Sequence, residues 1–432
     1  MAQGYTGYSI FNSEVTLKDS PLFDAFSRVR ISNPLTLFSS QFTYNLNPLL
    51  FKTYTAGTGA AVTHDTTNRC VNLSFTSSTN SSESRIQTYE HFQYQPGKSQ
   101  LFFISFNFNI TTYISNVKKY VGLTTGSSAI STSNETEILF VNSSGSTFFS
   151  IVSPTGTSTA TQTQWNIDKL DGSGPSGITL DLSKIQILVI DFQALYSGRV
   201  RVGFDLNGKI TYCHEFNHAN IKTSPYLQTA AFSITAGMTV FNNSGTPTTN
   251  MNLICAAVVS EGGTEDANLF AYSFVASNAS GVSVPNSSTH LISIRPKTTF
   301  NTFKNRAKLT YVDLEIFNEG SKAIKWELVV GQTISSGTWA DVDSTYSSTQ
   351  YLDANTGSPT LSGTPIVIDS GWINGTAGGK GQTSGSTITA RYPLTLNPDG
   401  TQRDLGTLTL KATCLDSAGT TVRANIKFKE LR

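Results

Sequence analysis

The sequence predicts an all-β protein built from β-sandwiches of the jelly-roll or lectin-like kind. No window of about a dozen residues shows the apolar i, i+3, i+4, i+7 pattern of a helix without Gly, Pro or β-branched clusters inside it. Short apolar or alternating runs bounded by Ser, Thr, Gly and Asn recur along the chain instead. Residues 101–108 (LFFISFNF) and 185–190 (IQILVI) are the clearest of these strands.

Three regions are expected along the chain. Residues 1–45 read as an extended N-terminal arm, residues 46–280 as the main β-sandwich domain, and residues 281–432 as a smaller C-terminal β-sandwich domain. The boundary follows a Ser- and Asn-rich stretch, residues 276–289, after which apolar alternation restarts. The strands expected in the C-terminal domain are residues 309–317, 323–330, 405–413 and 423–429.

One hairpin is well defined by its turn. Asn207-Gly208 supplies the positive φ angles that a two-residue turn needs, so residues 199–216 predict two antiparallel strands. With the strand at 185–190 they form a three-stranded meander. The Gly-rich stretch at 375–386 cannot bury a core and predicts a long flexible loop.

Composition and charge exclude several classes of protein. The chain has 432 residues, only 14% of them charged, with 30 basic against 29 acidic side chains and a net charge of +1. A net charge so close to zero produces no long-range positive potential that would attract nucleic-acid phosphates, so no nucleic-acid partner is expected. No apolar stretch approaches the roughly 20 residues of a membrane span, and the N-terminal residues lack a signal-peptide pattern, so we expect no membrane insertion and synthesis in a cytoplasm.

The cysteines and one histidine motif are the candidates for metal chemistry. Four widely spaced cysteines predict reduced, buried thiols rather than disulfides or a metal site. His214, Glu215 and His218 match the HExxH pattern, which places two zinc ligands and a general base on one helical turn. Here the motif falls on the return strand of the hairpin, where residues four apart are about 13 Å apart. We therefore interpret it as structural and expect no metal and no cofactor.

The strand interpretation also predicts which residues share a face. One face should carry Ile210, Tyr212, His214 and Phe216, and the other Thr211, Cys213 and Glu215.

Carboxylates and tryptophans offer two further possibilities. Asp191, Asp205 and Glu215 lie on neighbouring strands of the meander, as a glycosidase or depolymerase would need, although such proximity is expected by chance among 29 acidic residues. Of the four tryptophans, Trp165 and Trp326 are expected in cores. Trp339 and Trp372, flanked by Ser, Gly and Asp, are candidates for exposed contact.

Five separated segments together resemble a known family. They are residues 24–38 (DAFSRVRISNPLTLF), 94–100 (YQPGKSQ), 165–172 (WNIDKLDG), 174–181 (GPSGITLD) and 212–220 (YCHEFNHAN). Their order resembles that of a family of virion structural proteins of tailed bacteriophages, found especially in marine and large-genome phages and also in some large DNA viruses. The resemblance covers about residues 20–265.

This resemblance implies a non-enzymatic structural component of a phage virion, assembled in the host cytoplasm. We expect it on the particle exterior, as a tail-associated fibre or adhesin subunit, or alternatively as a capsid (head) decoration or head-fibre protein. A polysaccharide-binding or depolymerising β-sandwich is a lesser alternative. Expected partners are other virion proteins, a host-surface glycan and copies of the chain itself, as a trimer if closed symmetry follows the family. Phe23, Phe26, Arg28 and Arg30 would dock the arm onto the particle or a sister chain.

Overall fold

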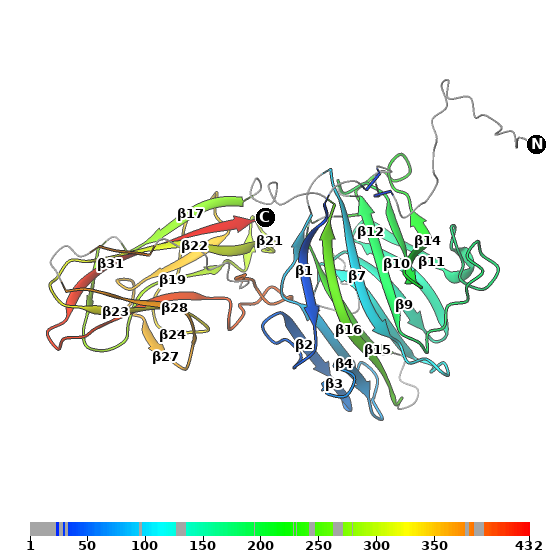
Figure 1. Ribbon diagram of the computed structural model, residues 1–432, viewed down its shortest axis with the longest axis horizontal. Helices are drawn as coiled ribbons and strands as arrows, with labels where there is room; N and C mark the ends of the chain where they lie inside the picture. The colour runs from blue at the N-terminus through cyan, green and yellow to red at the C-terminus, as the bar shows by residue number, and fades with distance from the viewer. Residues whose placement is uncertain are drawn as a thin grey trace, which may run out of the picture.

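The computed structural model describes residues 23–25, 29–30, 33–94, 97–126, 135–193, 195–227, 229, 231–241, 247–261, 271–278, 280–375, 380–383 and 393–432. These residues form two β-sandwiches, a larger one followed by a smaller one (Figure 1). Their only helix is a single 3₁₀ turn, η1 (Gln162–Gln164). The predicted fold class, an all-β chain with a main jelly-roll or lectin-like sandwich and a smaller C-terminal sandwich, is confirmed.

Sheet 1 forms one layer of the first sandwich, in the order β14-β13-β12-β7-β16-β4-β3, with β1 also paired to β16. Its strands are β1 (Leu35–Gln41), β3 (Ala60–Asp65), β4 (Cys70–Phe75), β7 (Ser99–Asn107), β12 (Gln186–Gln193), β13 (Val200–Leu206), β14 (Lys209–Phe216) and β16 (Thr249–Ser260).

Sheet 2 forms the other layer, in the order β11-β10-β9-β8-β15-β5-β2, with β6 also paired to β15. Its strands are β2 (Phe51–Ala56), β5 (Glu83–Thr88), β6 (Phe92–Gln93), β8 (Val117–Thr124), β9 (Glu137–Ser143), β10 (Ser146–Ser153), β11 (Gly156–Thr161) and β15 (Ala231–Val240).

The core between these sheets is dominated by phenylalanine. Strict alternation along β7 turns Phe102, Ile104 and Phe106 inward, and each is fully buried. Phe108 stacks on Phe140 of sheet 2, with ring centroids 5.5 Å apart. Such aromatic contacts between the layers fix their spacing and contribute beyond the area they bury.

The second sandwich also has two layers. Sheet 3 has the order β17-β31-β22-β29 with β18 also on β31, and sheet 4 the order β25-β26-β19-β30-β23-β28. Sheet 3 contains β17 (Ala271–Ser277), β18 (Val282–Val284), β22 (Lys308–Asn318), β29 (Lys380–Thr383) and β31 (Thr420–Leu431). Sheet 4 contains β19 (Thr289–Pro296), β23 (Ile324–Val330), β25 (Ala340–Asp341), β26 (Thr349–Asp353), β28 (Ile366–Ile373) and β30 (Leu408–Cys414). Two short ribbons pair β20 (Thr299–Phe300) with β21 (Phe303–Lys304) and β24 (Thr333–Ser335) with β27 (Thr360–Ser362).

The structure divides the chain at different points from those expected. β1 lies within the predicted arm, residues 1–45, yet it pairs with β16 as part of the first sandwich. At the other boundary, β17 precedes residue 281 but pairs with β31 of the second sandwich. β18 pairs with the same strand, so the Ser- and Asn-rich stretch at 276–289 contains the end of β17, β18 and the start of β19, and is not a connector between domains.

The hairpin and the meander are confirmed. β13 and β14 pair antiparallel around Asn207 and Gly208, whose φ angles are +57° and +76°. β12 pairs with β13 on its other side. Within the Gly-rich stretch at 375–386, residues 380–383 form β29 against β22, whereas 376–379 and 384–386 lie outside the described residues.

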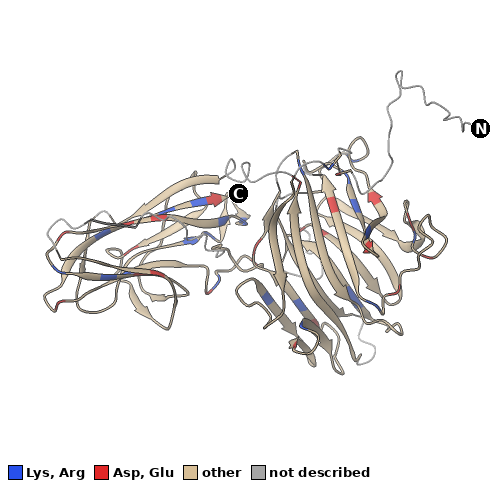
Figure 2. Ribbon diagram, viewed as in Figure 1, with Lys and Arg blue, Asp and Glu red and all other residues tan. Residues whose placement is uncertain are grey.

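Polar contacts join the two sandwiches. The charged residues of the molecule are few and scattered (Figure 2). Arg306 donates to the carbonyl of Thr125 at 2.7 Å, and Arg403 to that of Leu49 at 2.7 Å. Lys304 also forms an ion pair with a carboxylate of the first sandwich. Cations of the second sandwich therefore hold backbone and acidic groups at one end of the first.

Candidate functional site

The HExxH residues lie on and just beyond a strand. His214 and Glu215 belong to β14, and His218 follows after that strand has ended. The motif therefore does not lie on one helical turn, which is the arrangement that an HExxH zinc site needs.

Each histidine also has its own backbone partner. The N–H of Asn166 donates to His214 Nδ1 at 3.2 Å, and His218 Nδ1 donates to the Gly198 carbonyl at 2.8 Å. Burial lowers the pKa of both imidazoles. No group of three or more His, Cys, Asp or Glu side chains in the described part of the chain is arranged to hold a metal ion. The geometry therefore supports a structural role for the motif.

A β-bulge in β14 changes which residues share a face. Cys213 is left over between two consecutive pairs, Val202–His214 and Gly203–Tyr212. The bulge reverses the alternation, so Tyr212 lies on the outer face of sheet 1 while Cys213 packs in the core. The prediction that residues 210, 212, 214 and 216 share one face is wrong for this reason.

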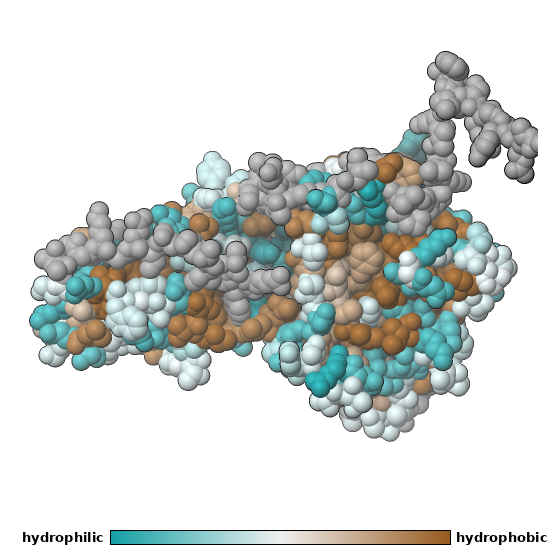
Figure 3. Space-filling view, in the orientation of Figure 1, coloured by the Kyte–Doolittle hydropathy of each residue, from teal (hydrophilic) through white to brown (hydrophobic). Residues whose placement is uncertain are grey.

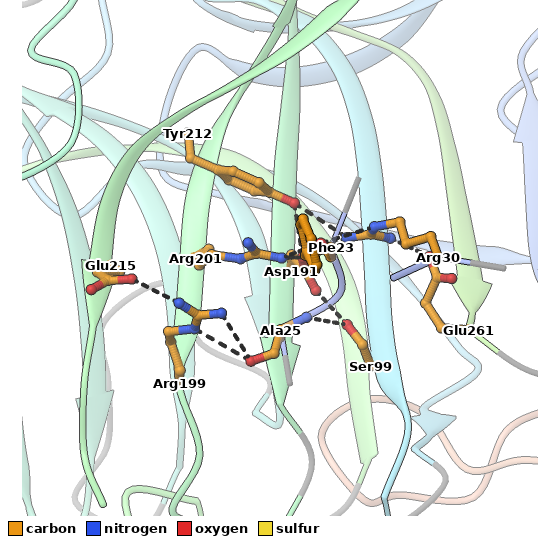
Figure 4. A network of polar contacts seen from close by, with 10 residues as sticks. All are labelled: Phe23, Ala25, Arg30, Ser99, Asp191, Arg199, Arg201, Tyr212, Glu215 and Glu261. Carbon is orange, nitrogen blue, oxygen red and sulfur yellow. Dashed lines mark hydrogen bonds and ion pairs between the residues drawn. The ribbon is translucent and has the colours of Figure 1, made fainter. Parts of the chain in front are cut away.

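The outer face of sheet 1 carries a polar site centred on Asp191 of β12 (Figure 4). Asp191 is fully buried and accepts four hydrogen bonds from side chains. Its Oδ1 accepts from Ser99 Oγ at 2.5 Å. Its Oδ2 accepts from Arg201 at 2.5 Å, Arg30 at 2.7 Å and Tyr212 at 2.8 Å. We call this cluster the anchor, because one of its donors, Arg30, comes from the N-terminal segment of the chain.

The anchor also binds the backbone of that segment. Arg201 donates to the carbonyl of Phe23 at 2.8 Å. The guanidinium of Arg199 donates twice to the carbonyl of Ala25, at 3.2 and 3.3 Å, and the Ala25 N–H donates to Ser99 Oγ at 3.3 Å. Because these contacts use backbone atoms, they fix the path of the segment whatever its side chains are.

Arg30 is the residue of the N-terminal segment whose side chain takes part in the anchor. It forms ion pairs with Asp191 and Glu261 and donates to the carbonyl of Phe23 at 3.1 Å. Burial lowers the pKa of this guanidinium, but its electrostatic interactions with Asp191, Tyr212 and Glu261 outweigh that effect, and the net pKa shift is upward. Burial raises the pKa of Glu261, and Arg30 partly offsets that rise. The segment therefore supplies a permanent cation that two buried carboxylates require.

The site contains a fourth ion pair, between Arg199 and Glu215. Arg199 lies 3.2 Å from Glu215, and both side chains are about one-fifth exposed. With this pair, the three arginines of the anchor meet the three carboxylates of Asp191, Glu215 and Glu261. Ion pairs of this kind fix geometry and do not present a free acid or base.

The structure brings together some predicted assembly residues. Phe23 and Arg30 lie at the anchor, whereas Phe26 and Arg28 are outside the described residues. The predictions missed Arg199 and Arg201. Their signal is an Arg-Val-Arg alternation at the start of β13, which turns two cations to one face of a strand.

Asp191, Asp205 and Glu215 do not form a pair of catalytic carboxylates. Asp191 has no exposed surface and is saturated by donors, and Glu215 is paired with Arg199. Neither group is placed to protonate or attack a substrate, because each already satisfies a neighbouring cation.

An apolar patch adjoins the anchor on the same face of sheet 1. Leu101, Val189 and Tyr212 are buried there, and Phe103 and Val259 are partly buried against them. Figure 3 shows the corresponding apolar surface over this sheet. The outer face of sheet 1 therefore combines a charged cluster with an adjoining apolar one.

The tryptophans separate as predicted into core and surface. Trp165 and Trp326 are buried in the first and second cores. Trp372, on β28, is 70% exposed. The ring of Trp339 is half-buried beneath the guanidinium of Arg295, 3.8 Å from its centroid. Both surface tryptophans belong to the second sandwich, apart from the anchor.

The outer face of sheet 2 contains a buried carboxyl group that the sequence did not indicate. Glu137 is 2% exposed, and burial raises its pKa to about 7. Lys118 and Arg85 lower that pKa, and Glu135 raises it.

This raised pKa predicts a pH dependence. Between pH 4.5 and 7 the folded chain holds a proton on Glu137 that the unfolded chain has lost, so stability falls as the pH rises through this range. Glu137→Gln should remove that slope and stabilise the first sandwich at pH 8 by on the order of 2 kcal/mol. Urea unfolding at pH 5 and pH 8 measures it, with the exposed Glu319→Gln as control. An unchanged slope in Glu137→Gln would contradict the prediction.

The four cysteines are free thiols. Cys70, Cys213 and Cys414 are buried free thiols, and Cys255 is a half-buried one. The described residues contain no helix long and apolar enough to cross a membrane.

No protein-family model matches the chain, and no curated protein matches it. Among solved structures it is similar to an endo-1,3-beta-glucanase from Streptomyces sioyaensis, at 14% identity over 54% of this chain and 98% of that chain, with a TM-score of 0.38. It is also similar to lectin II from Ulex europaeus (12% identity, 52% and 98% covered, TM-score 0.33) and to winged bean acidic lectin (9%, 53% and 98%, TM-score 0.35). At such identities and scores the likeness identifies no ligand or activity for this chain.

Proposed function

We propose that the protein is a non-enzymatic structural component of a phage virion, on the particle exterior, as a tail-associated fibre or adhesin subunit. The anchor is the observation that supports this proposal best. It fixes Phe23, Ala25 and Arg30, three residues of the N-terminal region, at a defined point on the outer face of sheet 1. A segment that attaches the protein to a particle must be firmly connected to the folded domain.

The surface chemistry supports the same role. Only 14% of the residues are charged, so contacts with neighbouring subunits depend little on salt. The candidate acids and bases of the anchor are tied to one another, as a structural rather than a catalytic site requires.

The test uses the phage whose genome encodes the chain. Mass spectrometry of purified particles should find the protein, and antibody labelling should place it on the tail. A chain lacking residues 1–22 should keep its β-sheet circular dichroism but fail to enter particles, while Ile185→Ala, an exposed change elsewhere, should enter normally. Absence from particles would overturn the proposal, and labelling of the head would favour a capsid decoration protein instead.

One observation favours a second candidate, a polysaccharide-binding sandwich. The indole of Trp372 is 70% exposed, and aromatic faces stack on the apolar faces of sugar rings. Binding of the full chain to a glycan array, lost in Trp372→Ala, would establish this function.

A further inference from the structure

The contact between the two sandwiches is polar. We call it the junction, and it joins two sets of residues, which are Leu49, Tyr89, Glu90, His91, Thr125 and Glu135 of the first sandwich and Lys304, Arg306, Lys308 and Arg403 of the second. Within the described residues, no apolar cluster has members in both sandwiches. Two domains held mainly by polar groups can separate without exposing either core.

The chain between β5 and β6 meets two cations of the second sandwich. The guanidinium of Arg403 lies over the ring of Tyr89, 3.7 Å from its centroid. Lys308 forms an ion pair with Glu90, whose side chain is 13% exposed. His91 is the next residue of this chain, so it enters the junction beside a positively charged part of the second sandwich.

His91 is enclosed at the junction. It is 4% exposed, and Arg306 and Lys304 act electrostatically on its imidazole. The same two cations hold the first sandwich. Arg306 donates to the carbonyl of Thr125 at 2.7 Å, and Lys304 forms an ion pair with Glu135 at 2.8 Å. A positive charge on His91 would therefore be repelled by groups that hold the junction together.

The carboxylates nearest these cations already have partners. Glu90 is paired with Lys308 and Glu135 with Lys304, so a protonated His91 would have to compete with a lysine for either of them. Asp399 accepts two hydrogen bonds from Thr401. The titratable groups that surround the junction are Lys52, Tyr54, Tyr89, Glu90, Glu135, Glu137, Lys304, Arg306, Lys308, Asp399, Arg403 and Asp404.

We propose that the junction is a pH-dependent contact, in which protonation of His91 in mildly acidic solution drives the second sandwich away from the first while both stay folded. The charge on His91 would face two cations across the contact, and separation removes that repulsion. This inference goes beyond the proposed function and does not depend on it.

The direction of the pH effect follows from the environment of His91. Burial lowers its pKa well below the ordinary 6.5, and Arg306 and Lys304 lower it further, whereas backbone contacts with Tyr89 and Thr125 oppose the shift. When the sandwiches separate, His91 loses both cations and binds a proton more readily. The contact is therefore at full strength above pH 6.5 and weakens as the pH falls below that value.

Hydrogen exchange of the full-length protein measures how often the junction opens. Peptides 87–93 and 303–309 lie on its two sides. After correction for the pH dependence of chemical exchange, their exchange in the wild type should rise at least tenfold from pH 7.5 to pH 5.0, relative to His91→Gln. Peptides from β4 and β23 should stay protected. Glu137 is present in both chains, so its titration does not affect the comparison.

A second variant covers the case in which His91→Gln fails to fold. Lys304→Gln removes one of the two cations that repel the charged imidazole, so pH should affect exchange at the junction less than in the wild type. Lys322→Gln is the matched control, since Lys322 is 39% exposed, close to the 47% of Lys304, and pairs with Asp416 of its own sandwich. It should keep the pH dependence of the wild type.

Three results would overturn the proposal. In the first, His91→Gln keeps the full pH dependence of the wild type. In the second, Lys304→Gln and Lys322→Gln respond to pH alike. In the third, only one of the two peptides exchanges faster in acid, which would indicate local unfolding and not separation of the sandwiches.

Discussion

Replacing Asp191 with alanine is expected to lower the stability of the first sandwich by about 3 to 5 kcal/mol. Asp191 is fully buried and neutralises Arg201, whose side chain is 1% exposed, together with Arg30. Removing the carboxylate leaves the buried guanidinium of Arg201 without its anionic partner and removes one of the two partners of Arg30. Tyr212 and Ser99 also lose the acceptor for their hydroxyl groups.

Hydrogen exchange followed by mass spectrometry can measure this loss for each sandwich separately. Peptides from β12 to β14 should exchange roughly 100-fold or more faster in Asp191→Ala, and peptides from β23 and β30 should not change. Asp205→Ala is the matched control, because Asp205 is a half-buried residue of the adjoining β13. We expect Asp205→Ala to lower the free energy of unfolding by less than about 1 kcal/mol. Equal effects in the two variants would show that the anchor contributes little to folding.

Replacing Glu430 with alanine should destabilise the second sandwich by a similar amount, about 3 to 5 kcal/mol. Glu430 on β31 has no exposed surface. Its carboxylate accepts hydrogen bonds from the hydroxyls of Ser347, Ser348 and Thr349 and from the Ser348 N–H. Without it, these buried donors lose their acceptor, and the turn before β26 loses its attachment to sheet 3.

In Glu430→Ala, hydrogen exchange should become faster in the second sandwich and stay unchanged in the first, the opposite of the pattern expected for Asp191→Ala. Peptides from β26 and β31 should lose protection in Glu430→Ala, while those from β12 to β14 keep it. Glu315→Ala is the control, because Glu315 lies on the neighbouring β22 in a partly exposed ion pair with Lys427. Its loss should cost less than about 1 kcal/mol. Loss of protection in both sandwiches would mean that they unfold as one unit.

Local patterns in the sequence were sufficient to predict β7, β12 and the turn between β13 and β14. Alternation along β7 and β12 gives the inward phenylalanines, because neighbouring residues of a strand point to opposite faces. Asn207-Gly208 specifies the β13–β14 hairpin, because a tight turn needs positive φ. The domain limits were less predictable, since β1 and β17 are recognisable as strands but their partners lie more than 100 residues away.

The HExxH string shows where a local pattern stops being informative. The placement of His214 and Glu215 on a strand follows from the hairpin alone. The bulge at Cys213 was not predictable, because it depends on the register of β14 against β13. That one residue decides that Tyr212 points to Asp191 and not into the core.

The sequence by itself determined the all-β class, the hairpin, the core tryptophans and the placement of His214 and Glu215 on a strand, because each depends on residues close together in the chain. Only the tertiary structure decided the anchor and the junction. Arg30, Asp191 and Glu261 are separated by up to 231 residues and meet through strand order. At the junction, Glu90 meets Lys308, which lies 218 residues further along the chain. Both depend on which distant segments become neighbours, and that is set by the packing of whole sheets and of the two sandwiches.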